Sequence, residues 1–185
     1  YFLYQNIAIL RKKEEKKWLL ERWVNKRVKR PKGQLIWVHV ASVGEALSTF
    51  PLIQKILADL PDTNVLVTSI TKTSAKLLKN YDDDRVIHQM SPFDTFFVSN
   101  RFLNHWKPDL AFRVESEIWP RILIEIKKRK IPNYLFNARF SIKTIERMKN
   151  DIISAKYLLS LFDQIHVPEK QSEQHLWMPN LTDKP

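Results

Sequence analysis

The sequence contains no cysteine and only two glycines, and both shortages narrow the range of functions. Without cysteine the chain forms neither a disulfide nor a thiolate metal site, which excludes zinc-ribbon and thiol-redox proteins. Dinucleotide sites and P-loops need several glycines where the backbone approaches phosphate. Because the chain has too few glycines for either motif, we do not expect a nucleotide phosphate loop.

Long apolar runs are also missing. Residues 1–10 are mostly apolar, but about 20 such residues are needed to span a bilayer, so this stretch cannot span one alone. A chain of 185 residues is long enough for one domain with a proper core and too short for two. We therefore expect a single domain.

Basic residues are abundant, with a formal net charge of +11, and most of the excess is N-terminal. Eleven Lys or Arg against three Glu between residues 1 and 33 leave +8 there. Apolar residues are interleaved with them: Trp18, Leu19, Leu20, Trp23, Val24 and Val28. A helix with these two faces is typical of membrane-surface helices, of basic helices packed on their own domain, and of some nucleic-acid-binding segments.

Apolar runs of strand length alternate with helical patterns through the rest of the chain. We expect strands at 35–40, 64–69, 85–90, 109–114, 133–136 and 164–167. We expect helices at 45–60, 72–80, 94–105, 119–130 and 141–161, the third with Phe97, Val98, Phe102 and Leu103 facing inward. This alternation predicts an α/β fold, a Rossmann-like parallel sheet with helices on both faces.

Polar side chains follow each predicted strand. After the first five strands, in chain order, they are Ser42 and Glu45, Thr71 and Thr73, Ser91 and Asp94, then Glu115, Ser116 and Glu117, and finally Asn137, Arg139 and Ser141. The carboxyl ends of parallel strands meet at one edge, where open α/β sheets bind their ligands. Carboxylates, hydroxyls, an amide and an arginine at this edge predict a cleft for a polyhydroxylated or anionic ligand.

Glu45 is the strongest candidate for chemistry. It follows Gly44, where we expect the backbone to turn from strand to helix. A carboxylate here can accept a proton from an attacking hydroxyl, or it can simply complement the helix dipole. Glu115 and Glu117 share a face if the segment is extended, so one of them lines the cleft, or Glu117 instead caps the next helix.

Four motifs in order resemble a known family. They are WVHVASVGE at 37–45, TSITKTS at 68–74, ESEIWP at 115–120 and NARFS at 137–141. Their order and spacing resemble the N-terminal half of the 3-deoxy-D-manno-octulosonic acid (Kdo) transferases of Gram-negative bacteria, over about residues 31–165. The resemblance implies half of a two-Rossmann-domain (GT-B) glycosyltransferase at the cytoplasmic face of the inner membrane. Such enzymes transfer Kdo from CMP-Kdo to a lipid A precursor during lipopolysaccharide synthesis.

The resemblance also implies roles for residues. Glu45 matches the proposed general base, and the family needs no tightly bound metal, so we expect neither a metal nor a cofactor; nucleic acid is not an expected partner. We expect substrate-binding roles for Ser42, Gly44, Thr71, Thr73, Glu115, Glu117, Asn137 and Arg139. The chain departs from the family at Arg113, usually apolar or methionine, and at Arg121, where asparagine is expected.

These inferences divide the chain into three parts. Residues 1–33 form a basic amphipathic membrane-proximal helix, 34–167 a Rossmann-like acceptor-binding domain and 168–185 an irregular tail. The C-terminal domain that binds CMP-Kdo in the family is absent, so we expect no transfer by this chain without such a domain. The alternative is a non-enzymatic basic Rossmann-like module that binds anionic lipid or nucleic acid.

Overall fold

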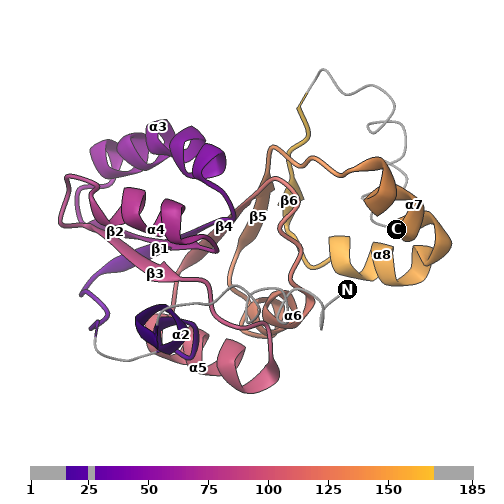
Figure 1. Ribbon diagram of the computed structural model, residues 1–185, viewed down its shortest axis with the longest axis horizontal. Coiled ribbons are helices and arrows are strands. Elements are labelled where there is room, and N and C mark those ends of the chain that lie inside the picture. The colour runs from indigo at the N-terminus through magenta and orange to yellow at the C-terminus, as the bar shows by residue number, and fades with distance from the viewer. Residues whose placement is uncertain (1–15, 25–27, 169–185) are drawn as a thin grey trace.

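The computed structural model describes residues 16–24 and 28–168, so the expectations for residues 1–15 and for nearly all of the C-terminal tail lie outside it. Six strands form one sheet in the order β3-β2-β1-β4-β5-β6 (Figure 1). The strands are β1 (Gln34–Val40), β2 (Thr63–Ser69), β3 (Val86–Met90), β4 (Leu110–Val114), β5 (Asn133–Phe136) and β6 (Gln164–Ile165). All neighbouring pairs are parallel, which confirms the predicted fold class.

The register places the carboxyl ends of the strands at one edge. Val40 pairs with Ser69, which pairs in turn with Met90. On the other side of β1, His39 pairs with Arg113. The loops that follow β1 to β5 therefore leave the sheet at a common edge, as the alternation predicts.

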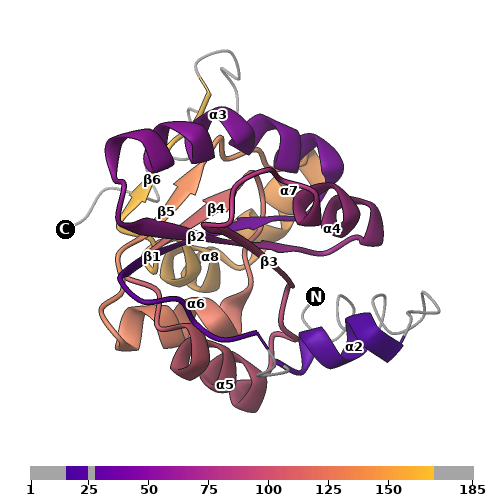
Figure 2. The same ribbon diagram turned by 90° about the vertical axis from the view of Figure 1, so that its left-hand side faces the viewer.

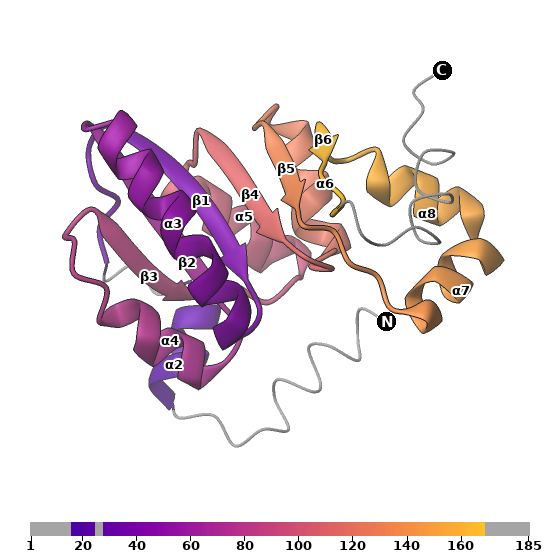
Figure 3. The ribbon, with the colours of Figure 1, turned by 90° about the horizontal axis from the view of Figure 1, so that it is seen from above.

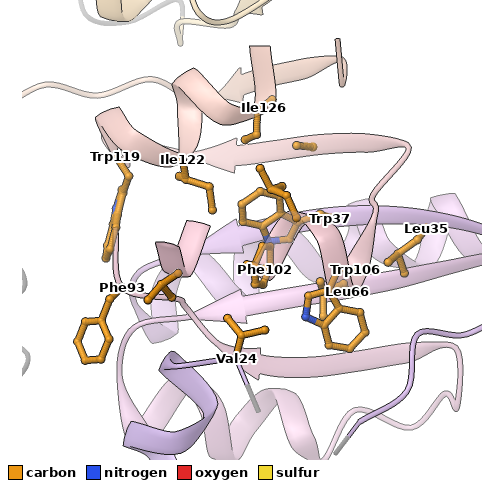
Figure 4. Close-up of a cluster of buried hydrophobic side chains, with 13 residues drawn as sticks. Val24, Leu35, Trp37, Leu66, Phe93, Phe102, Trp106, Trp119, Ile122 and Ile126 are labelled. Carbon is orange, nitrogen blue, oxygen red and sulfur yellow. The ribbon is translucent and has the colours of Figure 1, made fainter. Parts of the chain in front are cut away.

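Helices cover both faces of the sheet (Figure 2). One face carries α3 (Val43–Asp59) and α4 (Lys72–Lys79), and the other carries α2 (Lys16–Arg22), α5 (Phe96–Trp106) and α6 (Pro120–Lys128). Beneath the second group lies an apolar cluster that includes Trp37, Phe102 and Trp106 (Figure 4). The aliphatic runs of the central strands are buried on both sides, as continuous apolar strands require.

Phe97 departs from the predicted inward face of α5. The buried stripe of this helix is Val98, Ser99, Phe102, Leu103 and Trp106. Phe97 lies beside this stripe and is 80% exposed. The prediction was right for the other three apolar residues and wrong for Phe97.

The C-terminal helices lie beyond the β5 and β6 end of the sheet (Figures 1 and 3). We expected one helix over 141–161, but the chain forms α7 (Ile142–Asn150) and α8 (Ile152–Leu159). Asp151 separates them with a non-helical backbone (φ −133°, ψ 70°), and its side chain accepts a hydrogen bond from the amide of Ser154. The single-helix prediction was wrong because an aspartate favours the N-cap over the helix interior.

The short helix α2 packs against the carboxyl edge of β2 and β3. Arg22 is fully buried, and its guanidinium donates to the carbonyls of Ile70 (2.6 Å) and Ser91 (3.0 Å). The carboxylate of Glu21 accepts from the amide of Met90 (3.1 Å). This described part of the basic segment is therefore built into the domain, while Trp23 stays 54% exposed.

The two central strands are joined across a long stretch of sequence. The amide of Leu35 donates to the side chain of Asp109 (2.8 Å), and the amide of Asp109 donates to the carbonyl of Leu35 (2.9 Å). These two residues are 74 positions apart and hold the start of β1 against the start of β4. Hydrogen bonds between residues distant in the sequence therefore join β1 and β4 at the centre of the sheet.

Candidate functional site at the carboxyl edge of the sheet

Glu45 lies in the first turn of α3, directly after β1. The Ser42 hydroxyl accepts a hydrogen bond from the amide of Glu45 (3.2 Å), and Glu45 Oε2 accepts from the amide of Ala41 (2.7 Å). This reciprocal pattern resembles a capping box, which satisfies amides at a helix start. One oxygen of the carboxylate is therefore fixed at the end of β1.

The surroundings of Glu45 favour the protonated form of its carboxyl group. The residue is 8% exposed, and burial raises the pKa of its carboxyl group. The hydrogen bonds from Ala41 and Ser42 oppose this shift, while the negative charges of Glu117 and Glu115 add to it. A carboxylate with a raised pKa in a fixed position is suited to accept a proton.

Gly44 does not form the turn that the sequence suggested. The extended backbone at Ser42 (φ −121°, ψ 170°) makes the turn, and Gly44 is already inside α3. A Cβ atom added at Gly44 would meet only the Ser42 hydroxyl oxygen, at 3.9 Å. The fold itself does not require glycine here, and the position leaves bare backbone next to Glu45.

A buried network links β1 to the loop before α6. His39 Nε2 lies 3.5 Å from Glu117 Oε2, and the same oxygen accepts from Trp119 Nε1 (2.7 Å). On its other side, His39 Nδ1 lies 2.8 Å from the Thr68 hydroxyl oxygen. Glu117 is therefore held by two partners, and the alternative role of capping α6 is wrong.

Protonation in this network follows from its burial. Burial lowers the pKa of His39 and outweighs the attraction of Glu117. Burial acts to raise the pKa of Glu117, but the interactions with His39, Trp119 and the cation Arg113 together outweigh it, so that pKa is lowered. The pair is thus a neutral imidazole beside an ionised carboxylate.

Arg113 is a buried charge that sequence reasoning did not explain. Its guanidinium lies over the ring of Trp37 (4.9 Å to the centroid) and within 3.5 Å of the carbonyl of Glu117. Its Nε and Nη2 atoms have no hydrogen-bond partner among the described residues. Burial lowers the pKa of Arg113 to about 10, although the negative charges of Asp94 and Glu117 act to raise it. Arg113 therefore remains a cation at neutral pH.

Asp94 caps α6 from the loop after β3. Its Oδ1 accepts from the amide of Ile122 (2.7 Å) and its Oδ2 from the amide of Arg121 (3.1 Å). The residue before α6, Trp119, makes no side-chain cap. The expectation that Asp94 and Ser91 line an open cleft was wrong because both are buried, and burial raises the pKa of Asp94 to about 6.

The remaining predicted residues lie in the other loops of this edge. Thr71 caps α4 by accepting from the amide of Ser74 (3.2 Å), and Thr73 is exposed in the first turn of that helix. Arg139 is exposed and donates to the side chain of Asn137 (3.3 Å), rather than to either glutamate of the preceding loop. Thr71 and Thr73 follow β2, and Asn137 and Arg139 follow β5. Both strands belong to the same parallel sheet, so these residues lie at the carboxyl edge that also carries Glu45.

Glu115 does not share an extended face with Glu117. Its φ of +62° puts it in the left-handed region, so the chain turns directly after β4. The expected alternation of side chains fails at this turn. Both carboxylates nevertheless act on Glu45, since their charges raise its pKa.

Sequence comparison bears out the resemblance. The family model described as 3-deoxy-D-manno-octulosonic-acid transferase (kdotransferase) matches residues 17–180. The chain is 35% identical over 176 residues to a 3-deoxy-D-manno-octulosonic acid transferase of Rickettsia bellii, covering 95% of this chain and 41% of the relative. A relative of that name from Haemophilus influenzae is 34% identical over 117 residues, covering 63% of this chain and 27% of the relative.

Comparison with solved structures supports the fold. A crystal structure of UDP-N-acetylglucosamine 2-epimerase superposes with a TM-score of 0.51 at 15% identity, covering 80% of this chain and 46% of that one. This likeness concerns the fold alone. The chain spans less than half the length of these curated relatives, and by its sequence it belongs to the 3-deoxy-D-manno-octulosonic acid transferase family.

Proposed function

We propose that this chain is the acceptor-binding part of a glycosyltransferase that moves Kdo from CMP-Kdo to a lipid A precursor in lipopolysaccharide synthesis. Family membership supports the reaction class. The observation that carries the proposal is the position of Glu45, which is buried at the carboxyl edge with one oxygen fixed on the amide of Ala41. In this proposal Glu45 is the general base.

The chemistry assigned to Glu45 is a proton transfer. A hydroxyl oxygen of the acceptor forms a bond to the anomeric carbon of Kdo, while the bond from that carbon to the CMP phosphate oxygen breaks and CMP leaves with the electron pair. The hydroxyl proton passes to the Glu45 carboxylate. The raised pKa of Glu45 favours this step because the carboxylate holds the proton more tightly.

The neighbouring loops would hold the acceptor. The exposed guanidinium of Arg139, beside Asn137, suits a phosphate or carboxylate group. Ser42, Thr71, Thr73, Glu115 and Glu117 offer hydroxyls and carboxylates to sugar hydroxyls, and Gly44 leaves backbone accessible next to Glu45. In this proposal the donor CMP-Kdo is bound outside these 185 residues, and the transfer assay below therefore includes a donor domain.

We further propose peripheral attachment to the cytoplasmic face of the inner membrane. Among residues 16–24 and 28–168, no helix is both long enough and apolar enough to cross a bilayer. Aromatic residues cluster where α2 ends and α5 begins: Trp23 contacts Phe93 (5.5 Å between centroids) and Phe96 contacts Phe97 (5.3 Å). Trp23, Phe96 and Phe97 are 54%, 50% and 80% exposed, as in side chains that enter a membrane interface.

A vesicle experiment tests this attachment. Phe97→Ser should lower binding of the chain to vesicles that contain an anionic phospholipid. Leu47→Ser is the matched control, since Leu47 is 50% exposed on α3, on the opposite face of the sheet. Equal binding of the Phe97 variant and the wild type would show that this aromatic surface does not contribute to membrane attachment.

A transfer assay tests the reaction. The purified chain is incubated with a CMP-Kdo generating system and a tetra-acylated lipid A precursor, with and without the separately purified donor domain of a related enzyme. Product only when both parts are present, and its loss in Glu45→Gln, supports the proposal. Undiminished transfer by Glu45→Gln removes the general-base assignment.

The non-enzymatic alternative predicts a different outcome. If the folded chain yields no product with the donor domain but binds duplex DNA with a steep salt dependence and without preference for lipid A, an interaction module is the better description. The exposed aromatic cluster favours a lipid surface over nucleic acid within that alternative.

A further inference from the structure

An apolar pocket lies between α8, α7 and the loop that leads into α6. Its volume is about 370 Å³, within the range of about 300 to 1,000 Å³ that is usual for ligand pockets. Its lining includes Ser116, Ile118, Phe140, Met148, Ser154 and Leu158. Most of its lining is carbon, and no residue assigned above to proton transfer lines it.

The floor of the pocket is a buried part of the domain. Ile118, Phe140 and Leu158 belong to an apolar cluster that also contains Leu123 of α6 and Leu135 of β5. The wall formed by α7 is different, because none of the residues of that helix is buried. The pocket therefore has a firm apolar floor and a wall that few apolar contacts hold in place.

Apolar side chains supply most of the lining, and its polar members are Ser116, Thr144, Arg147, Asp151 and Ser154. Among the described residues, none of the buried side-chain nitrogen or oxygen atoms that lack a partner belongs to a lining residue of the pocket. The Asp151 side chain is used to cap α8. A hydrocarbon chain would bury apolar surface against this lining without losing hydrogen bonds of its own.

Position and charge suggest how such a chain arrives. Ser116 lies between Glu115 and Glu117, so the pocket begins at the edge of the candidate site. The surrounding helices are basic: α7 carries Lys143, Arg147 and Lys149 against Glu146, and Arg147 itself lines the pocket. Cations around an apolar pocket complement a ligand with an anionic head and an apolar tail.

We propose that this pocket binds one fatty acyl chain of an anionic lipid, with the head group beside the basic residues of α7. Identification of that lipid as the sugar acceptor rests on the proposed function; acyl-chain binding itself does not.

Filling the pocket tests the proposal. Ser154→Trp places an indole in the pocket from an exposed position of α8, and Ser116→Trp does so from the opposite end. Ser160→Trp is the matched control, since Ser160 is exposed at the end of α8 and does not line the pocket. Circular dichroism and thermal melting show whether each variant keeps the wild-type fold.

The probe is dodecyl phosphate, titrated calorimetrically into the 185-residue chain below its micelle concentration. We expect at least a tenfold loss of affinity in Ser154→Trp and in Ser116→Trp, and wild-type affinity in Ser160→Trp. Wild-type affinity in both pocket variants, absence of binding to the wild-type chain, or an equal loss in the control would overturn the proposal.

The proposed function fails separately. The pocket variants could lose affinity for dodecyl phosphate while the wild-type chain makes no Kdo product with a donor domain. That result would support the acyl pocket and contradict the proposed glycosyl transfer. If transfer occurs and the folded pocket variants bind dodecyl phosphate with wild-type affinity, the result supports the proposed glycosyl transfer and contradicts the acyl pocket.

Discussion

The imidazole of His39 and the carboxylate of Glu117 lie 3.5 Å apart and join the end of β1 to the loop before α6. Glu45 is attached to the same end of β1 through the amide of Ala41. The candidate base and the carboxylate that raises its pKa are therefore both held by a few residues of one strand. The separation of the two charges is thus fixed by the sheet.

The first prediction concerns this pair of carboxylates. Glu117→Gln keeps an oxygen for Trp119 Nε1 but removes the negative charge that raises the pKa of Glu45. We expect the titration midpoint of Glu45, followed by carbon-13 NMR of its carboxyl group, to move to lower pH. Glu146→Gln, on the exposed surface of α7, should leave the midpoint in place. An unchanged or higher midpoint in Glu117→Gln would contradict the prediction.

The second prediction concerns Asp94 and pH. The pKa of this buried carboxyl is about 6 in the folded chain, against about 3.9 when unfolded, so the folded chain holds the proton more tightly. Its contribution to the free energy of unfolding is full below pH 4 and falls by about 3 kcal/mol as pH rises to 6 and above. Asp94→Asn should therefore gain stability relative to the wild type over that interval. Urea unfolding at pH 4.5 and 7 measures the difference in free energy of unfolding between the variant and the wild type. A difference that is the same at both pH values would refute the prediction.

The third prediction separates folding from function at Gly44. Alanine has room there and favours a helix, so Gly44→Ala should raise the free energy of unfolding by up to about 1 kcal/mol. If a ligand approaches the bare backbone, the same variant should lower transfer in the two-part assay. Urea unfolding and initial rates give the two values. A destabilised variant would show that the glycine serves the fold.

The fourth prediction concerns the anchor of α2. Arg22→Met leaves the carbonyls of Ile70 and Ser91 without their charged donor in a buried place. We expect the free energy of unfolding to fall by about 3 kcal/mol in urea titrations. The exposed Lys17→Met should change it by less than about 0.5 kcal/mol. A loss in Arg22→Met as small as that of the control would mean that α2 is not needed for stability.

The fold was predictable from sequence because its strands are buried on both faces. Continuous apolar runs such as residues 35–40 stand out, and their alternation with helical patterns permits few other topologies. The break at Asp151 was missed since helical residues flank it on both sides. A helical period that continues across one capping residue conceals the cap.

The site was predictable in part. The position of Glu45 followed from the strand-to-helix transition, whereas the contact between His39 and Glu117 depends on which strands are neighbours. Arg113 and Asp94 were misjudged for a different reason. Charged residues are usually exposed, so no sequence rule predicts a guanidinium stacked on Trp37 or a carboxylate that caps a helix from another loop.

The hydrogen bonds between Leu35 and Asp109 have a consequence for biosynthesis, because these residues are far apart in the sequence. While the chain is being made, β1 and β2 can pair early, but the other edge of β1 stays open until β4 has left the ribosome. That edge belongs to a strand in which every residue after Gln34 is buried in the folded chain, and it can pair with other chains. Nascent chains stalled before residue 110 should therefore aggregate or recruit chaperones, and those extended past β4 should escape both.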